Sequence, residues 1–168
     1  PLMRLPLVAR RPLLLIHLLG GVGWFGAVLA YLVLAVVGLM DADPGLVRAS
    51  YRAMALVAWF VVTPLSLVGL ASGIVQALGT PWGLGRHWWV LIKLVMTVLS
   101  IAILLLHLGP TNILAQAASL GDVTPALARL RVQLVVAPSA ALLILATTAA
   151  LGVIKPKGLT PWTPLQVR

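Results

Sequence analysis

The sequence predicts an all-α integral membrane protein, a single domain built as a bundle of four spanning helices. Of its 168 residues, 61% are hydrophobic and 9% are charged, and the mean hydropathy is +1.10. Soluble domains carry about one-quarter charged residues. Four apolar stretches are each long enough to cross a hydrocarbon layer of about 30 Å. They cover residues 12–40, 54–78, 88–108 and 132–154, so the spans use nearly all of residues 1–168.

The first span, residues 12–40, begins at Pro12, which suits the first turn of a helix. This apolar run is too long for a removable secretory signal. A helical projection places His17, Gly20 and Trp24 on one face. That face combines a titratable group, a small residue and an aromatic ring.

The second span, residues 54–78, follows a predicted loop over residues 41–52. Pro64 stands in its middle and removes one backbone donor, so we expect a kink there. The hydroxyl groups of Thr63 and Ser66 are available to satisfy the freed backbone groups.

The third span, residues 88–108, is apolar but contains Lys93 and His107 on one polar stripe. Such a stripe is costly against lipid, so it should face the bundle interior, where ionisable residues are the first place to look for function. Pro110 is expected to stop this helix. A longer connection, residues 111–128, follows, and a short surface helix is predicted within it.

The fourth span, residues 132–154, is rich in alanine, is interrupted by Pro138 and ends at the basic segment that starts with Lys155. Twelve basic residues stand against three acidic ones, and the net charge is +9. The basic residues flank the spans, as membrane orientation demands, so nucleic acid is not an expected partner and the lipid bilayer is. The distribution of basic residues predicts both termini in the cytoplasm and a multi-pass location in the inner (plasma) membrane.

The chain has no cysteine, which excludes disulfides, thiolate metal sites and thiol catalysis. His17 and Lys93 are predicted to lie at one depth. His17 is five residues past Pro12 and Lys93 is five past Trp88, so each lies ~7–8 Å into its helix. Lys93 then either meets an anionic group, such as a haem propionate, a quinone oxygen or a lipid phosphate, or extends to the membrane surface.

His107 lies 14 residues beyond Lys93, which is ~21 Å along the helix axis. A haem held by His17 and His107 as paired axial ligands needs both imidazoles at one depth, so this pair is disfavoured. A haem or metal held by His17 alone, or by His17 with His87, stays open. His107, near the predicted helix end, is better explained as an interfacial hydrogen-bonding residue.

Two stretches resemble known families. The first span contains HLLGGVGWFGAVL, which is similar to the opening helix of the copper-resistance-D-like membrane proteins and the bacterial HemJ-type protoporphyrinogen oxidases, where a His is followed by a Trp-x-Gly element. The third span contains RHWWVLIKLVM, which is similar to their Lys-containing third helix. The stretch from residue 72 to residue 110 also resembles uncharacterised four-helix membrane proteins of actinobacteria. The resemblance implies an intramembrane site at His17, Trp24 and Lys93, with His17 as a haem ligand.

Three hypotheses follow. The first is a protein that binds haem b or a related redox cofactor, with His17 as ligand, Trp24 lining the pocket and Lys93 as the anion partner. The second is a copper-handling transporter or accessory protein that uses His17 and His107, with His87 as a further metal-ligand candidate. The third is a non-catalytic membrane subunit, able to form a homo-oligomer, in which the polar stripe only organises packing.

Overall fold

The computed structural model describes residues 6–121 and 123–161, and this part of the chain is helical and has no β-strand. The elements are α1 (Leu7–Met40), α2 (Pro44–Val57), the π-helix η1 (Ala58–Val62), α3 (Thr63–Gly79), α4 (Trp88–Leu120), the 3₁₀-helix η2 (Pro125–Leu127) and α5 (Ala128–Ile154). Four continuous helical segments are long and apolar enough to cross a membrane: Val8–Met40, Pro44–Gly79, Trp88–Leu120 and Pro125–Ile154. The predicted all-α bundle of four apolar helices is therefore confirmed.

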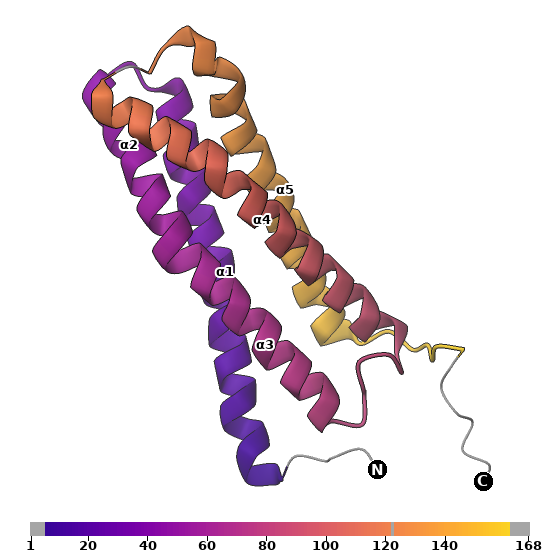
Figure 1. The fold of residues 1–168 in the computed structure, drawn as a ribbon. Coiled ribbons are helices and arrows are strands. Elements are labelled where there is room, and N and C mark those ends of the chain that lie inside the picture. Colours follow the sequence, from indigo (N-terminus) through magenta and orange to yellow (C-terminus); the bar gives the residue numbers. More distant parts are fainter. Residues whose placement is uncertain (1–5, 122, 162–168) are drawn as a thin grey trace, which may run out of the picture.

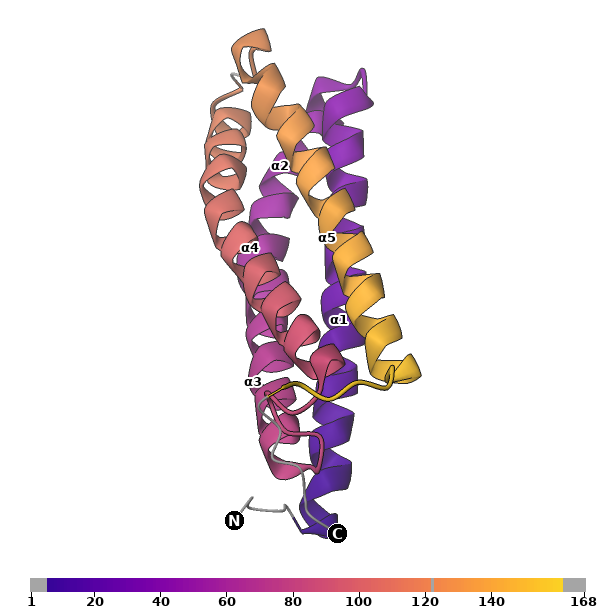
Figure 2. The same ribbon diagram turned by 90° about the vertical axis from the view of Figure 1, so that its right-hand side faces the viewer.

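Successive spans run in opposite directions along the long axis of the bundle (Figures 1 and 2). The start of α1, the end of α5 and the α3–α4 connection lie at one end, called the terminal end below. The α1–α2 turn and the η2 segment lie at the other, called the loop end. Spans one and three therefore run parallel, as expected.

The predicted loop over residues 41–52 is wrong, because α2 already begins at Pro44. Asp43 caps this helix, since its side-chain Oδ1 accepts a hydrogen bond of 2.8 Å from the Gly45 N–H. Pro44 follows at the first helical position, where a missing N–H costs nothing. Polar residues in this segment signalled a helix start rather than a loop.

The predicted stop at Pro110 is also wrong, because α4 continues through it to Leu120. The stretch expected as a separate surface helix is the last part of α4. Proline is tolerated inside spanning helices when nearby hydroxyl groups satisfy the backbone. Here Pro110 leaves the Leu106 carbonyl without its helical donor, and the Thr111 hydroxyl donates to the adjacent carbonyl, that of His107, at 2.8 Å. His107 therefore lies inside a long helix and not near its end.

The disturbance expected at Pro64 takes the form of a π-helix, η1, directly before it. The Thr63 hydroxyl donates to the Ala58 carbonyl at 2.8 Å, and the Ser66 hydroxyl donates to the Thr63 carbonyl at 2.7 Å. Both predicted hydroxyls donate to backbone carbonyls, but neither donates to that of Phe60, four residues before Pro64. The wider π turn lets the span continue past the proline.

Three helices meet at the loop end around the half-buried Arg131 of α5. Its Nη2 donates to the carbonyls of Gly38 and Leu39 at 2.7 and 3.1 Å, and its Nε donates to the Tyr51 hydroxyl at 3.0 Å. The guanidinium thus lies against the C-terminal end of α1, where a positive charge is favourable. One side chain links α1, α2 and α5.

Gly38 makes room for the Tyr51 ring. A Cβ at Gly38 would lie 2.7 Å from Cζ and 2.9 Å from Cε1 of Tyr51, which is a rigid aromatic ring. We predict that Gly38→Ala lowers the free energy of unfolding by about 1–3 kcal/mol, the usual cost of overpacking. Thermal unfolding in mild detergent measures this change. The matched control is Gly26→Ala in the same helix, where a Cβ would meet nothing within 4 Å; equal effects of both changes would contradict the packing argument.

Arg131→Gln should also destabilise the bundle, because it removes the charge from the end of α1 and leaves carbonyls of Gly38 or Leu39 unpaired. Hydrogen bonds from charged donors contribute about 1.5–3 kcal/mol, so we expect a loss of about 2 kcal/mol. The control is Arg129→Gln, two residues earlier and exposed. A wild-type unfolding midpoint in Arg131→Gln would show that the three contacts do not support the fold.

Candidate functional site

His17 is half-buried on α1 and faces α3. Its Nδ1 lies 3.0 Å from the hydroxyl oxygen of Ser72. The Ser72 hydroxyl donates its one proton to the Val68 carbonyl at 2.6 Å, so toward His17 it acts as the acceptor. Nδ1 is then the protonated nitrogen of the neutral ring, and the lone pair lies on Nε2. Ligating histidines in metal and haem sites commonly have this arrangement, in which the other ring nitrogen donates to a fixed acceptor.

Two further contacts join α1 to α3 near His17. A Cβ at Gly73 would lie 3.1 Å from Cε1 of His17, so this glycine gives the imidazole its place against α3. One turn further along α3, the Gln76 side-chain amide donates to the Leu13 carbonyl at 3.2 Å. The imidazole is therefore held from one side in a defined orientation.

Lys93, like His17, lies in the half of the bundle nearer the terminal end. The two side chains face different helices, since His17 contacts α3 and Lys93 contacts α5. The Lys93 Nζ points to α5, where it lies 2.8 Å from the position of a Cβ on Gly152. This places the ammonium at the last turn of α5, near helix carbonyls whose partial charge is negative. No carboxylate side chain faces it within the described residues, since the two described acids, Asp41 and Asp43, lie at the loop end.

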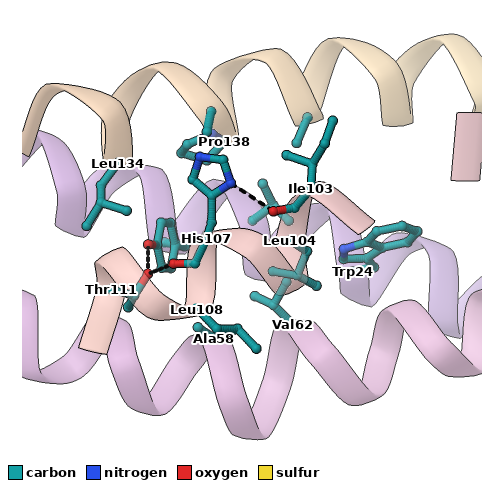
Figure 3. Close-up of a pocket in the computed structure, with 14 residues that line it drawn as sticks. Trp24, Ala58, Val62, Ile103, Leu104, His107, Leu108, Thr111, Leu134 and Pro138 are labelled. Atoms are coloured by element: carbon teal, nitrogen blue, oxygen red, sulfur yellow. Dashed lines mark hydrogen bonds between the residues drawn. The ribbon is translucent and has the colours of Figure 1, made fainter. Parts of the chain in front are cut away.

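Trp24 and His107 lie elsewhere, around a cavity of about 60 Å³ in the middle of the bundle (Figure 3). Trp24 is 5% exposed and packs against Gly69, deeper in the bundle than His17. His107 donates from Nδ1 to the Ile103 carbonyl at 2.8 Å, and the Gln133 amide lies 3.3 Å from its Nε2. The structure thus groups Trp24 with His107 around this cavity, whereas His17 lies against α3 and Lys93 against α5.

His87 belongs to a third group, at the terminal end. Its Nδ1 donates to the Trp82 carbonyl at 2.8 Å, and its ring lies 5.1 and 6.5 Å from the rings of Trp82 and Trp89. The ammonium of Lys155 lies over the same Trp82 ring, 5.6 Å from the ring centroid. This aromatic group lies at one end of the spans, as expected for residues at the membrane surface.

The three histidines do not form one metal site. Within residues 6–121 and 123–161, no group of three or more His, Cys, Asp or Glu side chains is close enough to hold a metal ion. A metal at any of the predicted ligands His17, His87 and His107 would need ligands from outside this set.

Ser72 and Thr111 are polar contact residues that the sequence reasoning missed. The Tyr31 hydroxyl lies 2.7 Å from the Thr111 hydroxyl oxygen and joins α1 to α4. A sequence signal for Ser72 existed, because it stands three residues after Gly69 on the glycine-rich face of the second span. Nothing in the sequence alone showed that this face meets His17.

Comparisons of the chain with family models, with curated proteins and with solved structures find no match.

The Ser72 contact has a direct test. In Ser72→Ala the acceptor for the Nδ1 proton of His17 is lost, so we expect the fraction of the Nδ1-protonated form of this ring to fall. Nitrogen NMR of histidine labelled with ¹⁵N, at a pH where the ring is neutral, reports the two forms. Ser119→Ala, an exposed serine of α4, is the control. An unchanged His17 spectrum in Ser72→Ala would show that Ser72 does not set the proton position.

Proposed function

We propose that this chain is a multi-pass membrane protein that binds haem b, or a related redox cofactor, at a polar site between spans one and three. His17 is the proposed ligand. The observation that carries the proposal is the hydrogen bond from His17 to Ser72, because it orients the ring and leaves the lone pair of Nε2 available for iron. A bound haem would supply one-electron redox chemistry.

Lys93 supports the proposal as the partner of an anionic group. A lysine within a membrane span is costly without a counter-charge. The described residues offer no carboxylate at the terminal end, so a ligand that brings its own carboxylates, as haem does, would complete the site. The role of Lys93 is to neutralise that charge and to orient the ligand.

These residues fit a haem site with His17 as one axial ligand and Lys93 as the cationic partner of a propionate. The cavity beside Trp24 is too small to form part of a haem site, because its volume of about 60 Å³ is far below the ~300 Å³ or more of sites for larger ligands. The proposal therefore rests on His17 and Lys93, and Trp24 is removed from the proposed cofactor contacts. The copper alternative has less support, since His107 faces another part of the bundle.

A structural role is the second candidate, and the same contacts favour it. The bonds from His17 to Ser72 and from Gln76 to the Leu13 carbonyl hold α1 against α3. In a membrane, such polar contacts contribute to helix association because apolar surfaces alone give little preference between protein and lipid. In this case the chain is a membrane subunit that carries no cofactor, and self-association would belong to this role.

We also propose that the terminal end faces the cytoplasm, with the protein in the inner (plasma) membrane. Arg4, Arg10, Arg11, Arg86, Lys155, Lys157 and Arg168 belong to the segments before α1, after α5 and between α3 and α4, or to their borders. The loop-end segments carry fewer basic residues, namely Arg48, Arg52, Arg129 and Arg131. An excess of basic residues marks the cytoplasmic side.

The test of the haem proposal is an absorption spectrum, oxidised and dithionite-reduced, of protein purified in mild detergent after expression with ample haem. We expect a Soret band in the wild type, its loss in His17→Ala and its retention in His107→Ala. Ser72→Ala should weaken the band without abolishing it. A colourless wild type, or a band unchanged in His17→Ala, would overturn the proposal and leave the structural role.

A further inference from the structure

An open groove between α2 and α4 lies at the loop end, away from His17 and from the cavity beside Trp24. Its volume is about 450 Å³, within the ~300–1,000 Å³ of sites that hold small organic ligands. One wall is formed by α2 and the other by the last turn of α4, residues 118–121. The residues of α2 that line it are Gly45, Arg48, Ala49 and Arg52.

Arg48 and Arg52 give this groove its charge. They are four residues apart, so their side chains project from the same face of α2. Both are exposed, and within residues 6–121 and 123–161 neither guanidinium has a hydrogen bond or an ion pair. Asp41 and Asp43, the described acids at this end, instead accept hydrogen bonds from backbone N–H groups at the start of α2. The groove therefore holds two positive charges that no described carboxylate contacts.

The C-terminal end of α4 accounts for only part of this arrangement. The Nη1 atom of Arg48 lies 3.7 Å from the position of a Cβ on Gly121, which ends α4 with a φ of 76°. A cation is favourable at such a helix end. Neither arginine, however, donates to a carbonyl there, and Arg52 lies one turn further along α2. Gly121 has no side chain that could cover the guanidinium of Arg48, so the groove stays open beside it.

Both arginines lie at the depth of lipid headgroups. The span Pro44–Gly79 has 36 residues and is ~54 Å long, so it extends ~12 Å beyond each side of a centred hydrocarbon layer of about 30 Å. Arg48 and Arg52 are four and eight residues past Pro44, which is ~6 and ~12 Å along the helix axis. They therefore lie within ~6 Å of the edge of the hydrocarbon layer, and the headgroup region is ~5–8 Å thick on each side.

Apolar surface adjoins the two charges. Leu120 lines the groove and is 84% exposed, and Leu46, next to Gly45, is 46% exposed. A phospholipid presents a phosphate next to acyl chains, which matches this combination, and a guanidinium binds phosphate through two parallel hydrogen bonds. Basic residues next to spanning helices recognise anionic headgroups in this way. We propose that the groove binds an anionic phospholipid, with Arg48 and Arg52 as the donors to its phosphate.

The experiment is native mass spectrometry of the full chain in mild detergent, with equal amounts of phosphatidylglycerol and phosphatidylcholine that have the same acyl chains. Both lipids carry a phosphate, but choline adds a positive charge that the two arginines repel. We expect phosphatidylglycerol to be retained with about ten-fold preference, the scale of one hydrogen bond from a charged donor. Arg48→Gln and Arg52→Gln should each lower this preference at least three-fold.

Matched controls separate the groove from net charge. Arg129→Gln removes one exposed charge at the same end and Lys157→Gln removes one at the terminal end, and both should keep the preference. An equal loss in these controls, or an unchanged preference in Arg48→Gln and Arg52→Gln, would overturn the site, whatever the result at His17.

Inorganic phosphate tests for a soluble anion as the occupant. Its binding is measured as a rise in the unfolding midpoint over chloride at equal ionic strength. A rise that is lost in Arg52→Gln, in a protein without preference for phosphatidylglycerol, would overturn the lipid assignment.

Discussion

The arrangement of the four spans depends on a few polar contacts between helices whose surfaces are otherwise apolar. Within a bilayer, apolar packing distinguishes poorly between a neighbouring helix and lipid, so hydrogen bonds and close approach at small residues decide which faces meet. Arg131 joins three helices at the loop end, Tyr31 and Thr111 join α1 to α4, and His17 with Ser72 joins α1 to α3. Each contact occupies some hydrogen-bonding atoms and leaves others available for a ligand. The candidate sites are where such atoms remain available.

The candidate functional residues of the spans fall into two regions with different chemistry. Near the terminal end, the region of His17 and Lys93 is basic and has no described carboxylate. In the middle, His107 and Trp24 border an apolar cavity whose polar groups are neutral. A charged ligand suits the first region and a neutral ligand the second. A single function that used both regions would need a charged cofactor near the terminal end and a neutral molecule in the middle of the bundle.

Composition and residue counting were sufficient for the four helices, because spanning segments follow from hydrophobicity and from the helical rise. The ends of the helices were not predictable in the same way. Pro110 favours a helix stop in a soluble protein, but spanning helices tolerate an internal proline, and α4 continues through it to Leu120. The Ser72 contact and the cavity depend on which helix faces meet, and a periodic pattern in one helix does not contain that information.

The length of the helices has a consequence for the membrane as well as for the protein. α1 has 34 residues and α4 has 33, so each is ~50 Å long, whereas the hydrocarbon layer is about 30 Å thick. A helix longer than the hydrocarbon layer tilts, thickens the surrounding lipid or extends its ends beyond the layer, and the first two cost free energy. Because α1, α2 and α5 are joined at the loop end through Arg131, they tilt together rather than separately. The bundle therefore responds to bilayer thickness as a unit. Lipid composition, which sets that thickness, affects the tilt of the helices and the membranes in which the protein is most stable.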